Sequence, residues 1–213
     1  MYTIDLHVHT QEYYSGATST EEEQICAAIA CGLDAIVLTD HQRLQSPARL
    51  KALNAAYAPF QIFGGVELAT WERTLCEFHR VLVFGVHKQH LTREEGFWSY
   101  PALHRVVQTH HGVMVLVHPF RFSLDIQLDL TRFPPDAIEA YSPNTPPEME
   151  SRILTLARDY DISVVSNSDA RHASELGRYY NELPSAPAHE QELLEILRAG
   201  HMQCVAARRL LKN

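Results

Sequence analysis

The sequence shows no secretory-leader pattern, no long apolar run and no excess of basic residues, the features that are typical of exported, membrane-spanning and duplex-binding proteins. Its first residues, among them Thr3, Asp5 and His7, are polar or charged where a secretory leader would have a basic region and an apolar run. No apolar run approaches the length of a bilayer crossing. The formal net charge is −8, so no overall basic field would attract duplex nucleic acid. We therefore expect a cytoplasmic protein that binds neither membranes nor duplex nucleic acid.

Cysteine is also scarce and shows no paired spacing. The chain contains no CxxC motif, and its four cysteines are Cys26, Cys31, Cys76 and Cys204. Cys26 and Cys31 fall in a helical pattern, where buried, reduced thiols are the usual outcome. This usage agrees with a cytoplasmic location.

The chain alternates short β-like runs with helical ones. Strands are expected at Thr3–His9, Asp34–Leu38, Phe60–Glu67, His79–Val86, Val113–His118, Ala137–Tyr141, Ile162–Ser166 and Gln203–Ala206. Helices are expected at Thr20–Cys31, Pro47–Tyr57, Pro101–His111, Pro146–Tyr160 and His189–Ala199. Repeated strand–helix units predict a parallel sheet with covering helices. We expect one α/β domain over residues 1–213, built as a barrel of about seven strands rather than as an open sheet.

Histidine, by contrast, is abundant, with 13 in the chain, and several lie at the ends of expected strands. His7 and His9 end the first strand, and their i, i+2 spacing places them on one face. In parallel α/β folds the loops at strand ends converge and bind ligands. Imidazoles and carboxylates together suit divalent ions such as Zn, Mn or Fe, and a carboxylate can bridge two of them. The candidate groups at these ends are His7, His9, Asp40, His41, Glu67, His79, His118 and Asp169.

Five motifs resemble those of the PHP (polymerase and histidinol phosphatase) superfamily. They are DLHVHT at Asp5–Thr10, LTDH at Leu38–His41, GGVE at Gly64–Glu67, VHPFR at Val117–Arg121 and NSDA at Asn167–Ala170. The resemblance covers nearly the whole chain. It implies a distorted (β/α)7 TIM-like barrel, two or three divalent metal ions at one rim, and phosphoesterase activity. It also implies a set of metal ligands in which Glu67 is the bridging carboxylate: His7, His9, His41, Glu67, His79, His118 and Asp169.

Two departures from the family pattern fall on a single metal position. Tyr14 and Ser15 stand where family members usually carry Asp or His after HxH. The chain reads SDARH in place of SDAH, which aligns Arg171 with the family's histidine and puts His172 one residue later. In family members with three metals, both missing ligands serve the ion that the TDH histidine also holds. The resemblance therefore implies a two-metal centre whose third position is weak or empty.

Arg171 allows two interpretations. Its guanidinium is a fixed cation with a fork suited to phosphate oxygens, so it could replace the charge of the third ion. Alternatively, Arg171 forms an outward salt bridge and His172 bends inward as a ligand. Arg121 follows a ligand in HPFR and is a second group that could neutralise phosphate oxygens. Asp40 could orient a ligand through a hydrogen bond or accept a proton.

Together these residues predict a metal-dependent phosphoesterase in which a metal-activated water attacks phosphorus. A small phosphomonoester, such as a nucleotide or histidinol phosphate, is the expected substrate class. The alternatives are a nuclease acting on short oligonucleotides and a non-catalytic module that binds metal or a nucleotide. The sequence leaves the substrate, the metal and the oligomeric state open.

Overall fold

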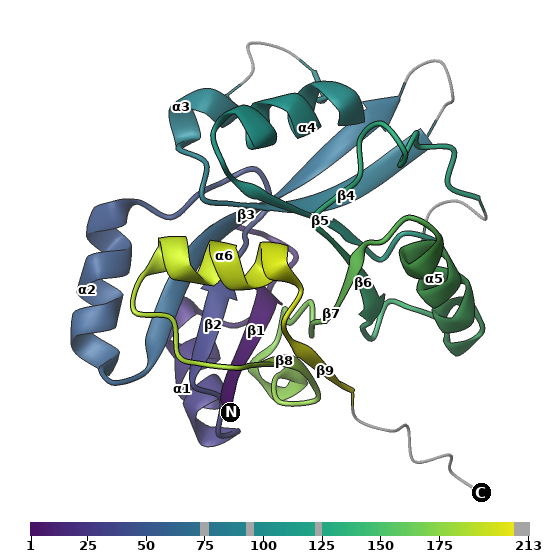
Figure 1. The fold of residues 1–213 in the computed structure, drawn as a ribbon. Helices are drawn as coiled ribbons and strands as arrows, with labels where there is room; N and C mark the ends of the chain where they lie inside the picture. The colour runs from purple at the N-terminus through teal and green to yellow at the C-terminus, as the bar shows by residue number, and fades with distance from the viewer. Residues whose placement is uncertain (73–76, 93–95, 122–124, 207–213) are drawn as a thin grey trace, which may run out of the picture.

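The strands form one sheet in the computed structural model, which describes residues 1–72, 77–92, 96–121 and 125–206 (Figure 1). Neighbouring strands follow the order β7-β6-β5-β4-β3-β2-β1-β8-β9. Cys76 lies outside the described residues. The strand bounds are β1 (Tyr2–Val8), β2 (Ala35–Leu38), β3 (Gln61–Glu72), β4 (Glu77–Phe84), β5 (Val113–Val117), β6 (Ala137–Tyr141), β7 (Ser163–Ser166), β8 (Tyr179–Leu183) and β9 (Gln203–Ala206).

The sheet is mixed, whereas the sequence predicted a parallel one. β1, β2 and β3 run parallel, as do β5, β6 and β7, but β4 is antiparallel to both β3 and β5. Only residues 73–76 separate β3 from β4, and a parallel crossover needs about a dozen residues or more. These two strands therefore have to pair in opposite directions. As a result, the start of β4 lies at the same rim as the ends of β3 and β5.

Polar side chains bring the two ends of the sheet together. Asn181 of β8 is fully buried, and its amide donates to the carbonyl of Ser166 in β7 (2.7 Å) and accepts from the Ser166 backbone nitrogen (2.9 Å). The Ser166 hydroxyl donates to the carbonyl of Val205 in β9 (2.7 Å). These contacts make a nearly closed, distorted barrel, which confirms the predicted fold class. β8 is absent from the predicted strands because Asn181 and Glu182 interrupt its apolar pattern.

Six α-helices and one 3-10 turn surround the sheet in the described residues. Thr20 and Glu23 form a capping box at the first helix, and Ser46 and Ser99 cap the second and the fourth. None of these helices has the length and apolar character that a bilayer crossing needs. Their bounds are α1 (Glu21–Ala30), α2 (Pro47–Tyr57), α3 (Lys88–Leu91), α4 (Tyr100–Thr109), α5 (Pro147–Asp159), α6 (Glu190–Ala199) and η1 (Ala173–Glu175).

Helix α6 lies across the sheet in Figure 1 and covers the end of the barrel at which β4 ends. Its Leu193, Leu194 and Leu197 belong to the apolar cluster inside the barrel. Gly85, directly after β4, leaves room for Leu194, since a Cβ there would come within 2.3 Å of its Cδ1. Arg198 donates to the carbonyl of His111, just before β5. With one end filled by α6, the other rim is left for a site.

Cys26 and Cys31 are exposed free thiols, so the prediction that they are buried is wrong. The buried stripe of α1 includes Ile25 and Ala28, which pack against the sheet. Cys26 lies outside this stripe, and Cys31 is the C-cap residue that follows the helix. Helical periodicity alone therefore placed Cys26 in the right helix but on the wrong face, and Cys31 lies one residue beyond that helix.

Candidate metal centre

Four buried side chains meet at the open rim of the barrel. His7 and His9 lie at the end of β1 and just beyond it, Glu67 lies within β3, and Asp169 follows β7. One potential ligand atom from each lies within 4.8 Å of the corresponding atoms of the other three. All four residues are at most 4% exposed. The structure thus brings together four residues that the sequence predicted as ligands, from β1, from β3 and from the segments that follow β1 and β7.

Glu67 stands among four imidazoles. Its Oε2 lies 3.1 Å from Nε2 of His9, 3.2 Å from Nε2 of His41 and 3.4 Å from Nε2 of His7. Its Oε1 faces another ring and lies 3.7 Å from Nε2 of His118. A carboxylate with its two oxygens turned to different imidazoles has the arrangement that a bridge between two ions requires.

The backbone is strained where two of these residues leave their strands. His118, directly after β5, has φ = +33°, and Asp169 has φ = +48°. Residues other than glycine rarely adopt such angles. Strained residues persist only where the surroundings hold them, and they concentrate at functional sites. The packing of the rim therefore has to hold His118 and Asp169 in these conformations.

The two buried carboxylates of the cluster, Glu67 and Asp169, stay ionised because of the positive charge beside them. Burial alone would raise the pKa of Glu67 and of Asp169, but the surrounding imidazoles outweigh it and lower both pKa values. Burial alone would lower the pKa of His7, but the carboxylates of Asp169, Glu139 and Glu67 outweigh it and raise that pKa well above its usual value. Buried carboxylates stay ionised only beside compensating positive charge.

The donor atoms fit divalent metal ions. Nitrogen and carboxylate oxygen are the ligand atoms that Zn, Mn and Fe accept. Nε2 of His7 and Nε2 of His9 lie only 3.1 Å apart. Within the described residues no group donates a hydrogen bond to Oδ1 of Asp169, although Nε2 of His9 lies 2.9 Å away. Lone pairs that converge in this way repel one another unless a cation lies between them.

Glu139 of β6 contacts His7 and the backbone of His118 and so helps to hold the cluster in place. The side chain is fully buried, and its Oε2 lies 3.3 Å from Nδ1 of His7 and accepts from Nδ2 of Asn167 (2.9 Å). Its Oε1 accepts from the backbone nitrogen of His118 (3.3 Å). A carboxylate on the outer nitrogen of a metal-binding histidine fixes the ring and its tautomer. Sequence reasoning missed Glu139, although one charged residue in the buried strand AIEAY was a usable signal.

His41 borders the cluster, but its Nε2, the nitrogen that faces Glu67, carries a proton and so cannot bind a metal. Nη1 of Arg80 donates to Nδ1 of His41 (2.5 Å), and burial lowers the pKa of His41 to about 3. A neutral imidazole that accepts at Nδ1 carries its proton on Nε2. That Nε2 faces Glu67, so His41 presents a proton there in place of a lone pair. The ring is held by stacking on His9, with centroids 4.8 Å apart.

Strand β4 turns the predicted ligand His79 away from the cluster. Leu82 lies opposite Glu67 in the β3–β4 ladder, and His79 is three residues from Leu82, so its side chain points to the other face. The His79 ring lies near that of Tyr100 in α4, with centroids 6.5 Å apart. Arg80 takes the cluster side, with Nη1 3.7 Å from Oε1 of Glu67. We therefore remove His79 from the ligand set.

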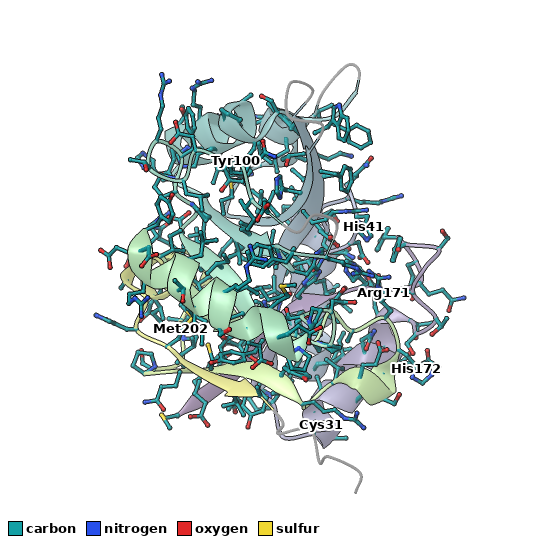
Figure 2. All side chains as sticks on the ribbon, turned by 90° about the vertical axis from the view of Figure 1, so that its right-hand side faces the viewer. Cys31, His41, Tyr100, Arg171, His172 and Met202 are labelled. Carbon is teal, nitrogen blue, oxygen red and sulfur yellow. The ribbon has the colours of Figure 1, made fainter. Side chains whose placement is uncertain are left out.

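Arg171 reaches the cluster, whereas His172 lies at the edge of the molecule (Figure 2). Nη2 of Arg171 lies 3.4 Å from Oδ2 of Asp169, and the guanidinium carbon lies 5.4 Å from the centre of the Tyr14 ring. His172 is exposed, and its Nδ1 accepts from the backbone nitrogen of Ser174 as the cap of η1. The structure thus contradicts the alternative in which His172 bends inward as a ligand.

The remaining candidates, Asp40 and Arg121, take different places. The Asp40 carboxylate accepts from the backbone nitrogen and hydroxyl of Thr10 at 2.6 and 2.9 Å. It holds the segment after β1 and does not face the cluster as a proton acceptor. Nη1 of Arg121 lies 3.5 Å from Oδ2 of Asp169, the oxygen that Arg171 also approaches. Arg121 therefore stays a candidate for binding an anion.

A comparison with protein families matches residues 5–204 to the PHP domain, a span that includes the whole cluster. The chain belongs to the PHP domain family. This match confirms the resemblance predicted from the five motifs. No curated protein is significantly similar to the chain.

Several solved structures, whose described activities differ from one another, share the fold of this PHP domain. A two-domain protein from Bacteroides vulgatus, containing a predicted PHP-like metal-dependent phosphoesterase, has a TM-score of 0.69 and 13% identity over 97% of this chain and 65% of that one. An amidohydrolase from Chromobacterium violaceum with bound sulfate and no metal has a TM-score of 0.68 and 16% identity over 91% and 96%. A lesion-specific endonuclease from Pyrococcus furiosus has a TM-score of 0.59 and 15% identity over 95% and 57%. At these identities the similarity concerns the fold alone.

Proposed function

We propose that this PHP domain is a metal-dependent phosphoesterase that hydrolyses a small phosphomonoester, such as a nucleotide or histidinol phosphate. The observation that carries the proposal is the position of Glu67, whose Oε2 faces His9 while its Oε1 faces His118. A buried carboxylate shared in this way suits the two-ion sites that hydrolyse phosphate esters. The cytoplasmic location of the protein stays a prediction from the sequence.

Two ions of Zn, Mn or Fe would be held by nitrogen and oxygen donors of the cluster. Bound there, the ions supply the Lewis acidity that attack of water on phosphorus requires. Glu139 keeps the Nε2 lone pair of the first histidine directed inward, and Asn144 donates to Oδ2 of Asp169 (2.5 Å) and so fixes that carboxylate. The proposed ligands are His7, His9, Glu67, His118 and Asp169.

Protein groups take the place of a third ion in this proposal. The Tyr14 ring lies 4.2 Å from that of His41 and 5.4 Å from that of His9, measured between centroids. Arg80 occupies Nδ1 of His41, which leaves no lone pair on the ring for a metal. The cation of Arg171 lies beside Tyr14 and Asp169. These contacts support two ions rather than three.

Arg121 and Arg171 are proposed to bind the phosphate group. Both side chains are 31% exposed while the Asp169 carboxylate that they approach is fully buried, so they lie between the cluster and solvent. Guanidinium groups form charge-assisted hydrogen bonds to phosphate oxygens and stabilise charge that develops on them.

Hydrolysis of p-nitrophenyl phosphate with added Mn, Zn or Fe tests the proposal, with His7→Ala as the matched variant. We expect metal-dependent release of p-nitrophenol, and a loss of kcat/KM of about a hundredfold or more in His7→Ala because one ligand is gone. Equal rates for the two proteins would end the enzymatic proposal.

The same assay distinguishes the two alternatives. Faster cleavage of bis-p-nitrophenyl phosphate than of the monoester would favour a nuclease acting on short oligonucleotides. Retention of metal with neither activity would favour a non-catalytic module.

A further inference from the structure

We infer that Arg80 is a further substrate-binding residue of this site and that, with Arg171, it selects a terminal phosphate carrying two negative charges. The inference rests on the proposed phosphoesterase function and specifies the substrate group that the site takes. Arg80 is not among the residues that the motifs single out, and its place follows from the register of β4 against β3.

Arg80 lies on the Glu67 side of the cluster. Its contacts with Nδ1 of His41 and Oε1 of Glu67 are both made by Nη1. A guanidinium has five N–H donors in a planar fork, so Nη2 and Nε can face an incoming anion. The Arg80 side chain is 24% exposed whereas that of Glu67 is 1% exposed, which puts the cation between the buried carboxylate and solvent. The guanidinium carbon also lies 5.2 Å from the centre of the Phe78 ring, which helps to hold it in place.

Arg171 lies on the Asp169 side and has an unsatisfied donor. Its Nη2 approaches Oδ2 of Asp169, but its Nε is buried and has no hydrogen-bond partner among the described residues. A buried guanidinium N–H without an acceptor is unfavourable and is expected where a ligand oxygen completes the site.

Each of the two arginines contacts one carboxylate of the cluster, Arg80 that of Glu67 and Arg171 that of Asp169. Oε2 of Glu67 and Oδ1 of Asp169 both lie about 3 Å from Nε2 of His9, at 3.1 and 2.9 Å. Arg80 and Arg171 approach the other oxygen of each carboxylate. A phosphate bound over the cluster would therefore have a guanidinium on each flank.

The chemistry of the phosphate decides what such a pair can select. A phosphomonoester has three non-bridging oxygens and close to two negative charges at neutral pH, because its second pKa is about 6. A phosphodiester has two such oxygens and one charge. Arginine binds phosphate through charge-assisted, fork-like hydrogen bonds. Guanidinium groups on two sides of the phosphate therefore bind the monoester, with its additional oxygen and charge, more tightly than the diester.

Binding of methyl phosphate and dimethyl phosphate to the metal-loaded protein tests this inference by calorimetry. We expect the wild type to bind methyl phosphate at least about tenfold more tightly than dimethyl phosphate, and Arg80→Gln to lose about a factor of ten of that preference. Arg158→Gln is the control, since Arg158 lies in α5 with a side chain that is 75% exposed, and it should keep the preference of the wild type. An unchanged preference in Arg80→Gln would overturn the inference.

Arg80→Lys covers the case in which Arg80→Gln loses metal or does not fold. Lysine keeps a positive charge near Glu67, so we expect wild-type metal content by mass spectrometry but a several-fold smaller preference for methyl phosphate, because an ammonium lacks the planar fork. A wild-type preference in Arg80→Lys would also overturn the inference. Neither step requires hydrolysis, so a protein that prefers methyl phosphate but hydrolyses no ester keeps this inference and loses the proposed function.

Discussion

His7 and Glu139 form a buried pair in which Nδ1 of the imidazole lies 3.3 Å from Oε2 of the carboxylate. The carboxylate favours the proton on Nδ1 and leaves Nε2 for a metal, so Glu139 is a positioning residue. We predict that Glu139→Gln weakens metal affinity by about 10- to 100-fold, measured by competition with a chromogenic chelator.

Glu148→Gln is the control for this variant, because Glu148 is exposed in the first turn of α5. It should bind metal as the wild type does. Wild-type affinity in a folded Glu139→Gln protein would show that Glu139 has no role in holding the ligand.

The apolar layer under α4 should determine much of the stability. Leu103 is fully buried there among Val107, Met114 and Leu116. We predict that Leu103→Ala lowers the free energy of unfolding by about 2–5 kcal/mol, measured by urea denaturation, because it removes buried apolar surface and leaves a cavity. Gln108→Ala, at an exposed position of the same helix, should change it by less than about 0.5 kcal/mol. Equal effects of the two variants would contradict this packing.

The thiol of Cys204 should react slowly and with a shifted pH dependence. Burial raises the pKa of Cys204 to about 11, and Sγ lies 3.3 Å from the carbonyl of Val164. Since the thiolate is the reactive form, only about one Cys204 in a thousand is reactive at pH 8, and the rate should rise as the pH approaches 11. Alkylation followed by peptide mass mapping should therefore label the exposed Cys26 and Cys31 at least about tenfold faster. Equal rates at pH 8 in the folded protein, or a difference that persists in denaturant, would contradict this account.

Much of the site could be predicted from the sequence because ligands at strand ends need little knowledge of the fold. His7 and His9 follow from a two-residue period at the end of one strand, and Glu67 and Asp169 follow from the GGVE and NSDA motifs. The strand and helix pattern likewise predicted a barrel. These features depend on local periodicity and on the meeting of strand ends at one rim.

The residues that could not be predicted depend on strand direction and register. The choice between His79 and Arg80 is a choice between the two faces of β4, and a slip of one residue reverses every side chain of a strand. The true length of β3 and the antiparallel pairing of β4 decide that choice, and neither is visible in the apolar pattern. The inward position of Arg171 depends in the same way on how the chain turns after Asp169, at a positive φ.

The most direct test of the account is the number of metal ions that Glu67 allows the chain to bind. We predict two ions per wild-type chain after equilibrium dialysis against Mn, Zn or Fe, measured by plasma mass spectrometry, and the loss of at least one ion in Glu67→Gln. Glu22→Gln, an exposed carboxylate change in α1, should keep both ions. A wild type that binds no ion, or a Glu67→Gln protein that retains two, would contradict the central claim that this buried carboxylate bridges a dinuclear site.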